Sequence, residues 1–236
     1  MRLTDFDAMT FDCYGTIIDW ERGILAILAP WAREQGLETT DDGLLEAFAA
    51  LEGDIQRMNP TQPYPEVLRD VFMGLARRLG ALADPEQARA FGESVGEWPP
   101  FADSAAALQS LKRTHQLAIL SNVDNASIRR SVARLGVEFD LIVTAEDAGA
   151  YKPAHNHFEN AFAWFERHGT PPERIVHVAQ SLHHDHVPAK ALGMRTIWVD
   201  RRRGKPGGAT PTTSDTVTPD LVVASLEELA QMSVSG

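Results

Sequence analysis

The chain has 236 residues, 44% of them hydrophobic and 23% charged, so it can bury a sizeable core as one domain with an inserted module or as two small domains. Its net charge of −11 argues against a general affinity for nucleic acid or anionic membranes, while leaving room for a small anionic substrate at a local positive charge. A single cysteine, no signal-peptide pattern in Met1–Asp7 and no apolar run near the roughly 20 residues of a membrane span together predict a cytoplasmic globular protein.

Short apolar runs of β type occur at six places along the chain. They are Ala8–Phe11, Leu117–Leu120, Leu141–Val143, Ile175–Val178, Thr196–Val199 and Leu221–Val223. Apolar residues at helical spacing separate the later runs, as in Phe158, Ala161, Phe162 and Phe165. Strands that alternate with helices predict an α/β fold whose parallel sheet is covered on both faces.

The long segment between the first two runs has an almost entirely helical pattern. Three apolar stripes lie in it, at Ile24–Trp31, Leu44–Ile55 and Val67–Leu79, and Pro30 is expected to kink or end the first helix. An insertion after the first strand of an open sheet forms a lid over the carboxyl end of that strand, where such sheets bind ligands. We therefore predict a core of residues 1–17 and 99–236 and a helical cap domain of residues 18–98.

Two further segments have no regular pattern. The stretch Arg201–Thr218 is rich in Gly, Pro, Thr and Arg, which predicts a surface loop. The last residues, Met232–Gly236, are predicted to be a frayed tail.

Polar residues that could take part in catalysis or ligand binding follow four of the strand-like runs. They are Asp12, the pair Ser121-Asn122, Lys152 and Asp185. Each alone has an ordinary explanation, such as a helix cap, a turn former or a solvated lysine. Because the carboxyl ends of parallel strands meet at one edge, we expect the four features to form one site.

This order of motifs resembles the haloacid dehalogenase superfamily over nearly the whole chain. The segment Phe11-Asp12-Cys13-Tyr14-Gly15-Thr16 is similar to its first motif, Leu120-Ser121-Asn122 to its second and Tyr151-Lys152-Pro153 to its third; Val178–Asp185 is similar to its fourth. The resemblance implies a Rossmann-like core with a cap domain and a nucleophilic Asp12. It also implies that Lys152 pairs with that carboxylate, that Ser121 and Asn122 bind the anionic part of a small substrate, and, by the family's habit, a homodimer.

The superfamily contains both phosphatases and dehalogenases, and two positions distinguish them here. A phosphatase needs an acid two residues after the nucleophile to protonate the leaving alcohol, and this chain has Tyr14, whose ordinary pKa of roughly 10 suits that role poorly. It also needs a carboxylate for Mg²⁺ in the fourth motif, where this chain has Gln180, which offers at most a carbonyl oxygen. Both departures favour carbon–halogen chemistry, which needs neither acid nor a cofactor.

The sequence therefore predicts hydrolytic dehalogenation of short 2-haloacids. Asp12 would attack the halogen-bearing carbon and form an ester, and water would hydrolyse the ester with Asp185 and Lys152 placing or activating it. The Asp-x-Tyr-Gly-Thr form of the first motif is the form of the 2-haloacid dehalogenase branch. We expect Tyr14, Thr16 and Gln180 to contact the substrate, although Tyr14 can also be a packed aromatic and Thr16 a cap for the next segment.

The halide-binding part of the resemblance is incomplete. The L-2-haloacid dehalogenases that this chain resembles carry an arginine in the second cap helix where this chain has Ala47, a tyrosine where it has Phe158, and an asparagine where it has Leu182. Trp20, Arg22 or Arg57 could supply a replacement donor from the cap. The preferred halogen and the chain length of the substrate therefore stay open.

Two features invite other interpretations. The run His183-His184-Asp185-His186 lacks the spaced partners of a metal site, so we predict no metal there, although a histidine could donate to the leaving group or orient water. Cys13 is expected to pack rather than react. Two alternatives remain open: a phosphatase that uses Mg²⁺, and a binding protein that has lost catalysis.

Overall fold

One parallel sheet forms the centre of the molecule, in a computed structural model that describes residues 1–205, 207–210 and 217–234. Its strand order is β3-β2-β1-β4-β5-β6, as in doubly wound nucleotide-binding folds. The strands are β1 (Ala8–Phe11), β2 (Gln116–Ser121), β3 (Leu141–Thr144), β4 (Ile175–Ala179), β5 (Arg195–Val199) and β6 (Leu221–Val223). All six predicted runs are strands, so the predicted α/β fold with a parallel sheet is confirmed.

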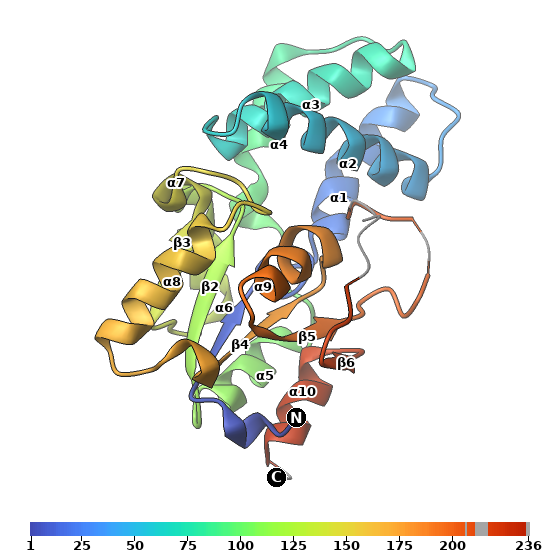
Figure 1. Cartoon of the computed structure of the whole chain (residues 1–236). Helices are drawn as coiled ribbons and strands as arrows, with labels where there is room; N and C mark the ends of the chain where they lie inside the picture. The colour runs from blue at the N-terminus through green and yellow to red at the C-terminus, as the bar shows by residue number, and fades with distance from the viewer. Residues whose placement is uncertain (206, 211–216, 235–236) are drawn as a thin grey trace.

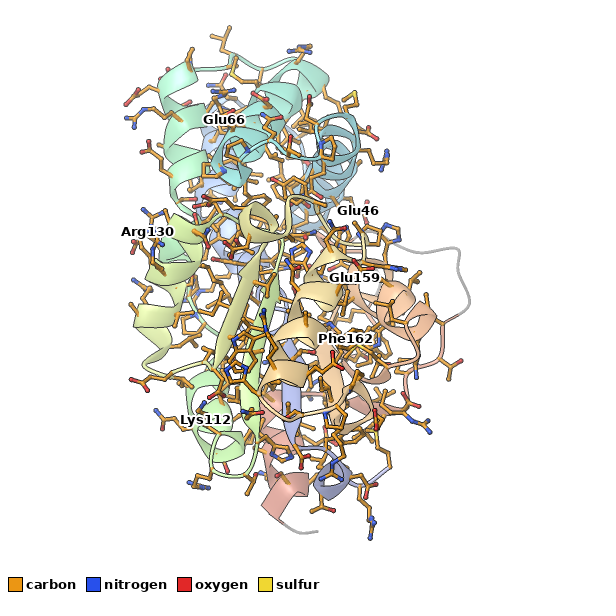
Figure 2. All side chains as sticks on the ribbon, turned by 60° about the vertical axis from the view of Figure 1, so that its left-hand side comes forward. Glu46, Glu66, Lys112, Arg130, Glu159 and Phe162 are labelled. Atoms are coloured by element: carbon orange, nitrogen blue, oxygen red, sulfur yellow. The ribbon has the colours of Figure 1, made fainter. Side chains whose placement is uncertain are left out.

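Helices cover both faces of this sheet (Figure 1). Side chains alternate between the two faces along β2. Leu117 and Ile119 pack in the core between the sheet and one set of helices, and Ala118 and Leu120 pack in the core on the opposite face. The first set is α5 (Ser104–Leu111), α6 (Asn125–Leu135) and α10 (Leu226–Val234); the second is α8 (Asn156–Arg167) and α9 (Val187–Ala191). Figure 2 shows Glu159 on α8, where this residue is exposed, whereas Phe162 of the same helix is partly buried against the core.

A second group of helices stands at the carboxyl end of the strands (Figure 1). It contains α1 (Trp20–Glu34), α2 (Asp41–Met58), α3 (Tyr64–Leu79), α4 (Pro85–Glu93) and the turn η2 (Val95–Glu97), all between β1 and β2. Local sequence sets their ends: the Thr40 hydroxyl accepts a hydrogen bond from the Gly43 amide at the start of α2, and Gly80 ends α3 at a φ of 69°. We propose these helices as the cap domain, residues 18–98.

Short elements complete the chain and hold the loops at the edge of the sheet. They are η1 (Leu3–Asp5), α7 (Ala145–Ala148), η3 (Pro172–Arg174) and η4 (Leu182–His186), the last a π-helical turn. No helix in the described part of the chain is long and apolar enough to cross a membrane.

Some expectations about local structure need correction. Pro30 does not end the first helix, because α1 continues to Glu34. Met232 and Ser233 belong to α10, so this part of the predicted tail is helical, and residues 235–236 lie outside the described residues. Of the predicted loop Arg201–Thr218, residues 206 and 211–216 are also outside them. The described part is irregular but bound to the cap, because Arg202 pairs with Glu21 and Asp42.

Candidate active site

Two aspartates and a lysine meet at the carboxyl end of the sheet. The Lys152 ammonium donates to Asp12 Oδ1 at 2.9 Å, to Asp185 Oδ1 at 2.6 Å and to the Leu120 carbonyl at 2.8 Å. These three bonds use all of its donors. All three charged side chains are buried. The sequence features after β1 and β4 and the lysine after α7 thus converge as expected from the parallel topology.

The cluster contains two carboxylates and one ammonium, and its surroundings shift the pKa values of the two carboxyls in opposite directions. Burial raises the pKa of Asp12, and Asp185 acts in the same direction, while Lys152 and Thr16 oppose them. Burial would also raise the pKa of Asp185, but Lys152 and His177 hold it well below its usual range. Burial would lower the pKa of Lys152, yet the two carboxylates raise it, so the lysine stays charged. Asp12 is therefore the more basic carboxylate, a property that suits a nucleophile.

A second hydrogen-bond chain orients Asp12. The Gln180 backbone amide donates to Thr16 Oγ1 at 2.9 Å, and the Thr16 hydroxyl donates to Asp12 Oδ2 at 2.7 Å. Thr16 is fully buried and does not line the cavity in front of Asp12. It also caps no helix, since α1 begins after Asp19. The structure thus gives Thr16 a contact with the nucleophile, where we had expected one with the substrate.

Two residues that were not predicted from the sequence, Thr10 and His177, support the Asp185 carboxylate through hydrogen bonds. Thr10 and His177 lie opposite each other on β1 and β4. His177 Nε2 is 3.1 Å from Asp185 Oδ1, and its Nδ1 is 2.9 Å from Thr10 Oγ1. Since a carboxylate only accepts hydrogen bonds, Nε2 carries a hydrogen. Phe158 packs edge-on against the His177 ring, at 5.0 Å between centroids. The signal available in the sequence was one polar residue inside each of two otherwise apolar strands.

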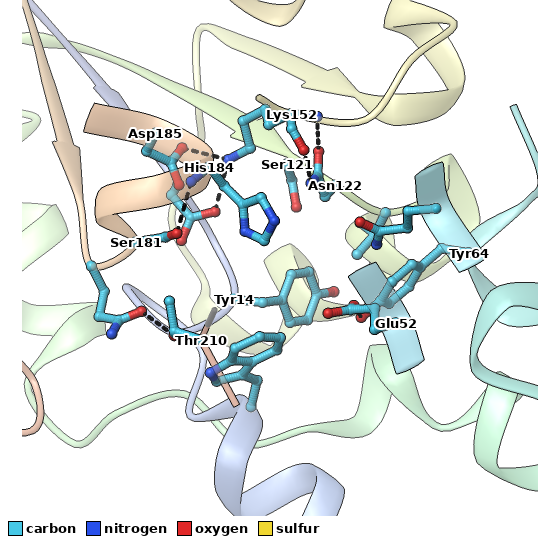
Figure 3. Close-up of a pocket in the computed structure, with 15 residues that line it drawn as sticks. Tyr14, Glu52, Tyr64, Ser121, Asn122, Lys152, Ser181, His184, Asp185 and Thr210 are labelled. Carbon is cyan, nitrogen blue, oxygen red and sulfur yellow. Dashed lines mark hydrogen bonds and ion pairs between the residues drawn. The ribbon is translucent and has the colours of Figure 1, made fainter. Parts of the chain in front are cut away.

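Core and cap enclose a cavity of about 40 Å³ in front of Asp12, room for only a few small atoms. Eight predicted residues line it: Asp12, Tyr14, Trp20, Ser121, Asn122, Lys152, Gln180 and Asp185. Seven others also line it: Glu52, Gln56, Tyr64, Val123, Ser181, His184 and Thr210. Figure 3 shows Glu52 and Tyr64 on the side opposite Lys152 and Asp185. Glu52 and Gln56 interrupt the apolar stripe of α2, which is the signal that could have revealed them.

Tyr14 and Gln180, at the two positions where a phosphatase has acids, are neutral side chains that are hydrogen-bonded to other residues. The Tyr14 and Ser131 hydroxyls share a hydrogen bond of 2.8 Å, and burial raises the pKa of Tyr14 well above its usual range, so it is a weak proton donor. The side-chain oxygen Oε1 of Gln180 accepts a hydrogen bond from the Thr210 hydroxyl at 2.7 Å. No group of three or more His, Cys, Asp or Glu side chains within the described residues could hold a metal ion. At these two positions the side chains therefore offer no carboxylate, the ligand that Mg²⁺ prefers.

Ser121 and Asn122 play different parts. Asn122 bonds to the Lys152 backbone at both ends of its amide: Nδ2 donates to the carbonyl at 3.1 Å, and Oδ1 accepts from the Lys152 amide at 2.7 Å. It therefore fixes the segment that carries the lysine. Ser121 Oγ is buried and has no hydrogen-bond partner among the described residues, so it is the member of the pair left to bind a ligand.

The cap donors suggested by the sequence do not all reach the cavity. Trp20 lines it, whereas Arg57 pairs with Asp54 and lies in an outer cleft between cap and core; Arg22 lines neither space. Of the histidine run, His184 lines the cavity, and burial lowers its pKa to about 4, which keeps it neutral. Cys13 is buried with a raised pKa, as expected for a packed thiol.

Comparison with known proteins identifies the family of this chain. A family model for haloacid dehalogenase-like hydrolases matches residues 9–199, and the chain belongs to that family. The predicted superfamily is therefore confirmed, and the protein is a hydrolase of this type.

Individual relatives fall on both sides of the family's chemistry. An (S)-2-haloacid dehalogenase of Pseudomonas putida is 26% identical over 222 residues, which cover 87% of this chain and 92% of the relative. A phosphoserine phosphatase of Thermus thermophilus is 30% identical over 210 residues, 88% of this chain and 74% of the relative. The L-2-haloacid dehalogenase of Xanthobacter autotrophicus with chloropropionic acid covalently bound superposes with a TM-score of 0.77 at 19% identity, over 98% and 99% of the two chains, and so shares the fold.

Proposed function

We propose that this protein hydrolyses the carbon–halogen bond of short 2-haloacids through an ester on Asp12. The observation that carries the proposal is that Tyr14 and Gln180 provide no acidic group to the site. Both stand where a phosphatase needs an acid, and both are neutral and hydrogen-bonded to Ser131 and Thr210. A halide leaves as a stable anion and needs neither a proton nor a metal at that step. The covalently bound chloropropionate in the Xanthobacter autotrophicus structure supports the same chemistry.

In the first step, a carboxylate oxygen of Asp12 attacks the halogen-bearing carbon. A carbon–oxygen bond forms, and the carbon–halogen bond breaks with its electron pair on the halide. Lys152 and Thr16 hold the Asp12 carboxylate in place during the attack. Ser121, buried and unpartnered among the described residues, receives the acid group of the substrate. Attack in line with the leaving group inverts a chiral carbon.

In the second step, water attacks the carbonyl carbon of the Asp12 ester. The hydroxy acid leaves with the original Asp12 oxygen, the carboxylate is restored, and one proton is released. Asp185 Oδ2 is buried beside the cavity without a hydrogen-bond partner among the described residues, which suits it to hold the water. Its depressed pKa makes it a group that orients water more than one that removes a proton. Neutral His184 lines the same cavity and can hydrogen-bond that water, while the released proton passes to solvent.

The proposal needs no cofactor, and the decisive test measures halide release from chloro-, bromo- and fluoroacetate in the presence of EDTA. We expect release from at least one substrate, and Asp12→Asn should reduce it to background. One turnover in H₂¹⁸O should place the label in the peptide that contains Asp12. No release from any of the three by folded protein would refute the proposal.

The same assays separate the alternatives. A phosphatase, which the Thermus thermophilus relative represents, would hydrolyse a phosphate ester and lose that activity in EDTA. A binding protein without catalysis would release neither halide nor phosphate, and Asp12→Asn would change nothing.

A further inference from the structure

Glu52 is a buried carboxyl in the wall of the cavity that belongs to the cap. It lies on α2 and is 3% exposed. The Tyr64 hydroxyl of α3 donates to its Oε1 at 2.6 Å, while Oε2 has no hydrogen-bond partner among the described residues. Figure 3 shows the Glu52 carboxyl between Tyr14 and Tyr64, facing into the cavity. A buried acid with one occupied oxygen and one free oxygen calls for an explanation.

The groups around Glu52 favour its neutral form. The titratable or charged residues that share its cavity or interact with it electrostatically are Tyr64, Tyr151, Tyr14, Asp12, Asp185, Lys152 and His184. Lys152 is the one cation lining the cavity within the described residues, and its donors are used by Asp12, Asp185 and a carbonyl. Burial raises the pKa of Glu52 to about 7, although the Tyr64 hydrogen bond opposes this. A bound anion would raise that pKa further.

The direction of attack places the leaving group on the side of the cavity where Glu52 lies. A displacement by Asp12 requires the halogen on the line that leads away from the attacking oxygen. Asp12 belongs to the core, so the halogen points toward the residues that the cap contributes: Trp20, Glu52, Gln56 and Tyr64. Ala47, on the same helix as Glu52, is not among the residues that line the cavity.

On the basis of the proposed dehalogenation, we propose that Glu52, in its protonated form, donates a hydrogen bond from Oε2 to the departing halide. Tyr64 determines the geometry, because its hydroxyl occupies Oε1 and leaves the proton on the oxygen that faces the cavity. The proton stays on Glu52 throughout. The bond that breaks is the carbon–halogen bond, whose electron pair leaves with the halide.

This role predicts a loss of activity in alkali. A raised folded-state pKa means that the protonated form dominates at low pH and is lost as pH rises through that pKa. Ionised Glu52 would repel both the substrate and the halide. We expect kcat/KM for chloroacetate to fall about tenfold per pH unit above the Glu52 pKa. Glu52→Gln keeps a neutral donor that cannot ionise, so its kcat/KM should lose this alkaline limb.

The experiment compares wild type, Glu52→Gln and Glu52→Ala, with Glu46→Gln as an exposed control on the same helix. Glu52→Ala should lower kcat/KM for chloroacetate about tenfold or more, and should affect iodoacetate less, because iodide is the weaker hydrogen-bond acceptor. Glu46→Gln should match wild type throughout. An equal loss on both substrates would indicate a structural role and overturn the proposal, as would an alkaline limb that persists in Glu52→Gln.

A binding measurement keeps this inference separate from the proposed function. Bromide binding can be followed by tryptophan fluorescence, since Trp20 lines the cavity. Wild type should bind bromide at least tenfold more weakly at about pH 8.5 than at about pH 6, and Glu52→Gln should bind it equally at both. Halide release by wild type without this difference would refute the role of Glu52 alone. Absence of any halide release would refute the proposed dehalogenation, while the bromide comparison would still decide whether Glu52 is a halide donor.

Discussion

Replacing Lys152 by methionine should destabilise the fold more than any change at a surface charge. Methionine has a similar length but removes three hydrogen bonds, of 2.9, 2.6 and 2.8 Å. The buried charge of the cluster then changes from −1 to −2, with both carboxylates unpaired. Breaking a buried ion pair in this way costs about 3–5 kcal/mol. At about 2–4 °C per kcal/mol for a chain of this size, the melting temperature should fall by about 6–20 °C.

Thermal and urea unfolding, followed by circular dichroism, measure this loss. Lys190→Met is the matched control, because Lys190 pairs with Asp220 in a partly exposed site, and it should cost at most about 1 kcal/mol. Adding Asp12→Asn to Lys152→Met should restore part of the stability by removing one of the unpaired charges. The deficit should also shrink as pH falls, because protonation of the two carboxyls relieves their repulsion. A loss below about 1 kcal/mol would refute the view that Lys152 neutralises the cluster.

Three further changes test the parts of the site separately. Thr16→Val should lower kcat about ten- to hundredfold with little change in KM, because Asp12 Oδ2 loses its donor; steady-state kinetics would contradict this if KM alone rose. His177→Asn should slow hydrolysis of the ester more than its formation, since Asp185 loses its support, so intact-protein mass spectrometry should show a larger fraction of the Asp12 ester than in wild type. Gln180→Asp should create measurable Mg²⁺ binding by calorimetry, because it adds a carboxylate beside Asp12, and unchanged binding would show that Thr210 and the loop block the site.

Much of the core could be predicted from the sequence because its signals are local. The strand runs combine apolar and β-branched residues, and a residue directly after a parallel strand must lie at the ligand-binding edge. That rule alone predicts that Asp12 and Ser121 lie at this edge, and the combination with the other motifs predicts their role in the site. Lys152 and Asp185 lie farther from their strands, and it is the order of the motifs that places them.

The rest of the site depends on packing that local patterns do not contain. The contact between Thr10 and His177 exists only because β1 and β4 pair in one register. Glu52 and Tyr64 meet across two cap helices, and they reach the cavity only through the way α2 and α3 stand over the core. The same limit explains why Arg57 was a plausible donor from sequence, although it pairs with Asp54 outside the cavity.

The charge of the cluster gives the proposed reaction its order. At rest, Asp12, Asp185 and Lys152 sum to −1 in a buried site, and burial raises the pKa of Asp12, so its free carboxylate is the least stable member. Forming the ester removes that charge and leaves Lys152 and Asp185 as a balanced pair at 2.6 Å. The departing halide then meets a neutral Glu52 instead of a second carboxylate. Water must restore the excess charge, so we expect hydrolysis of the ester, where Asp185 and His177 act, to be the slower step.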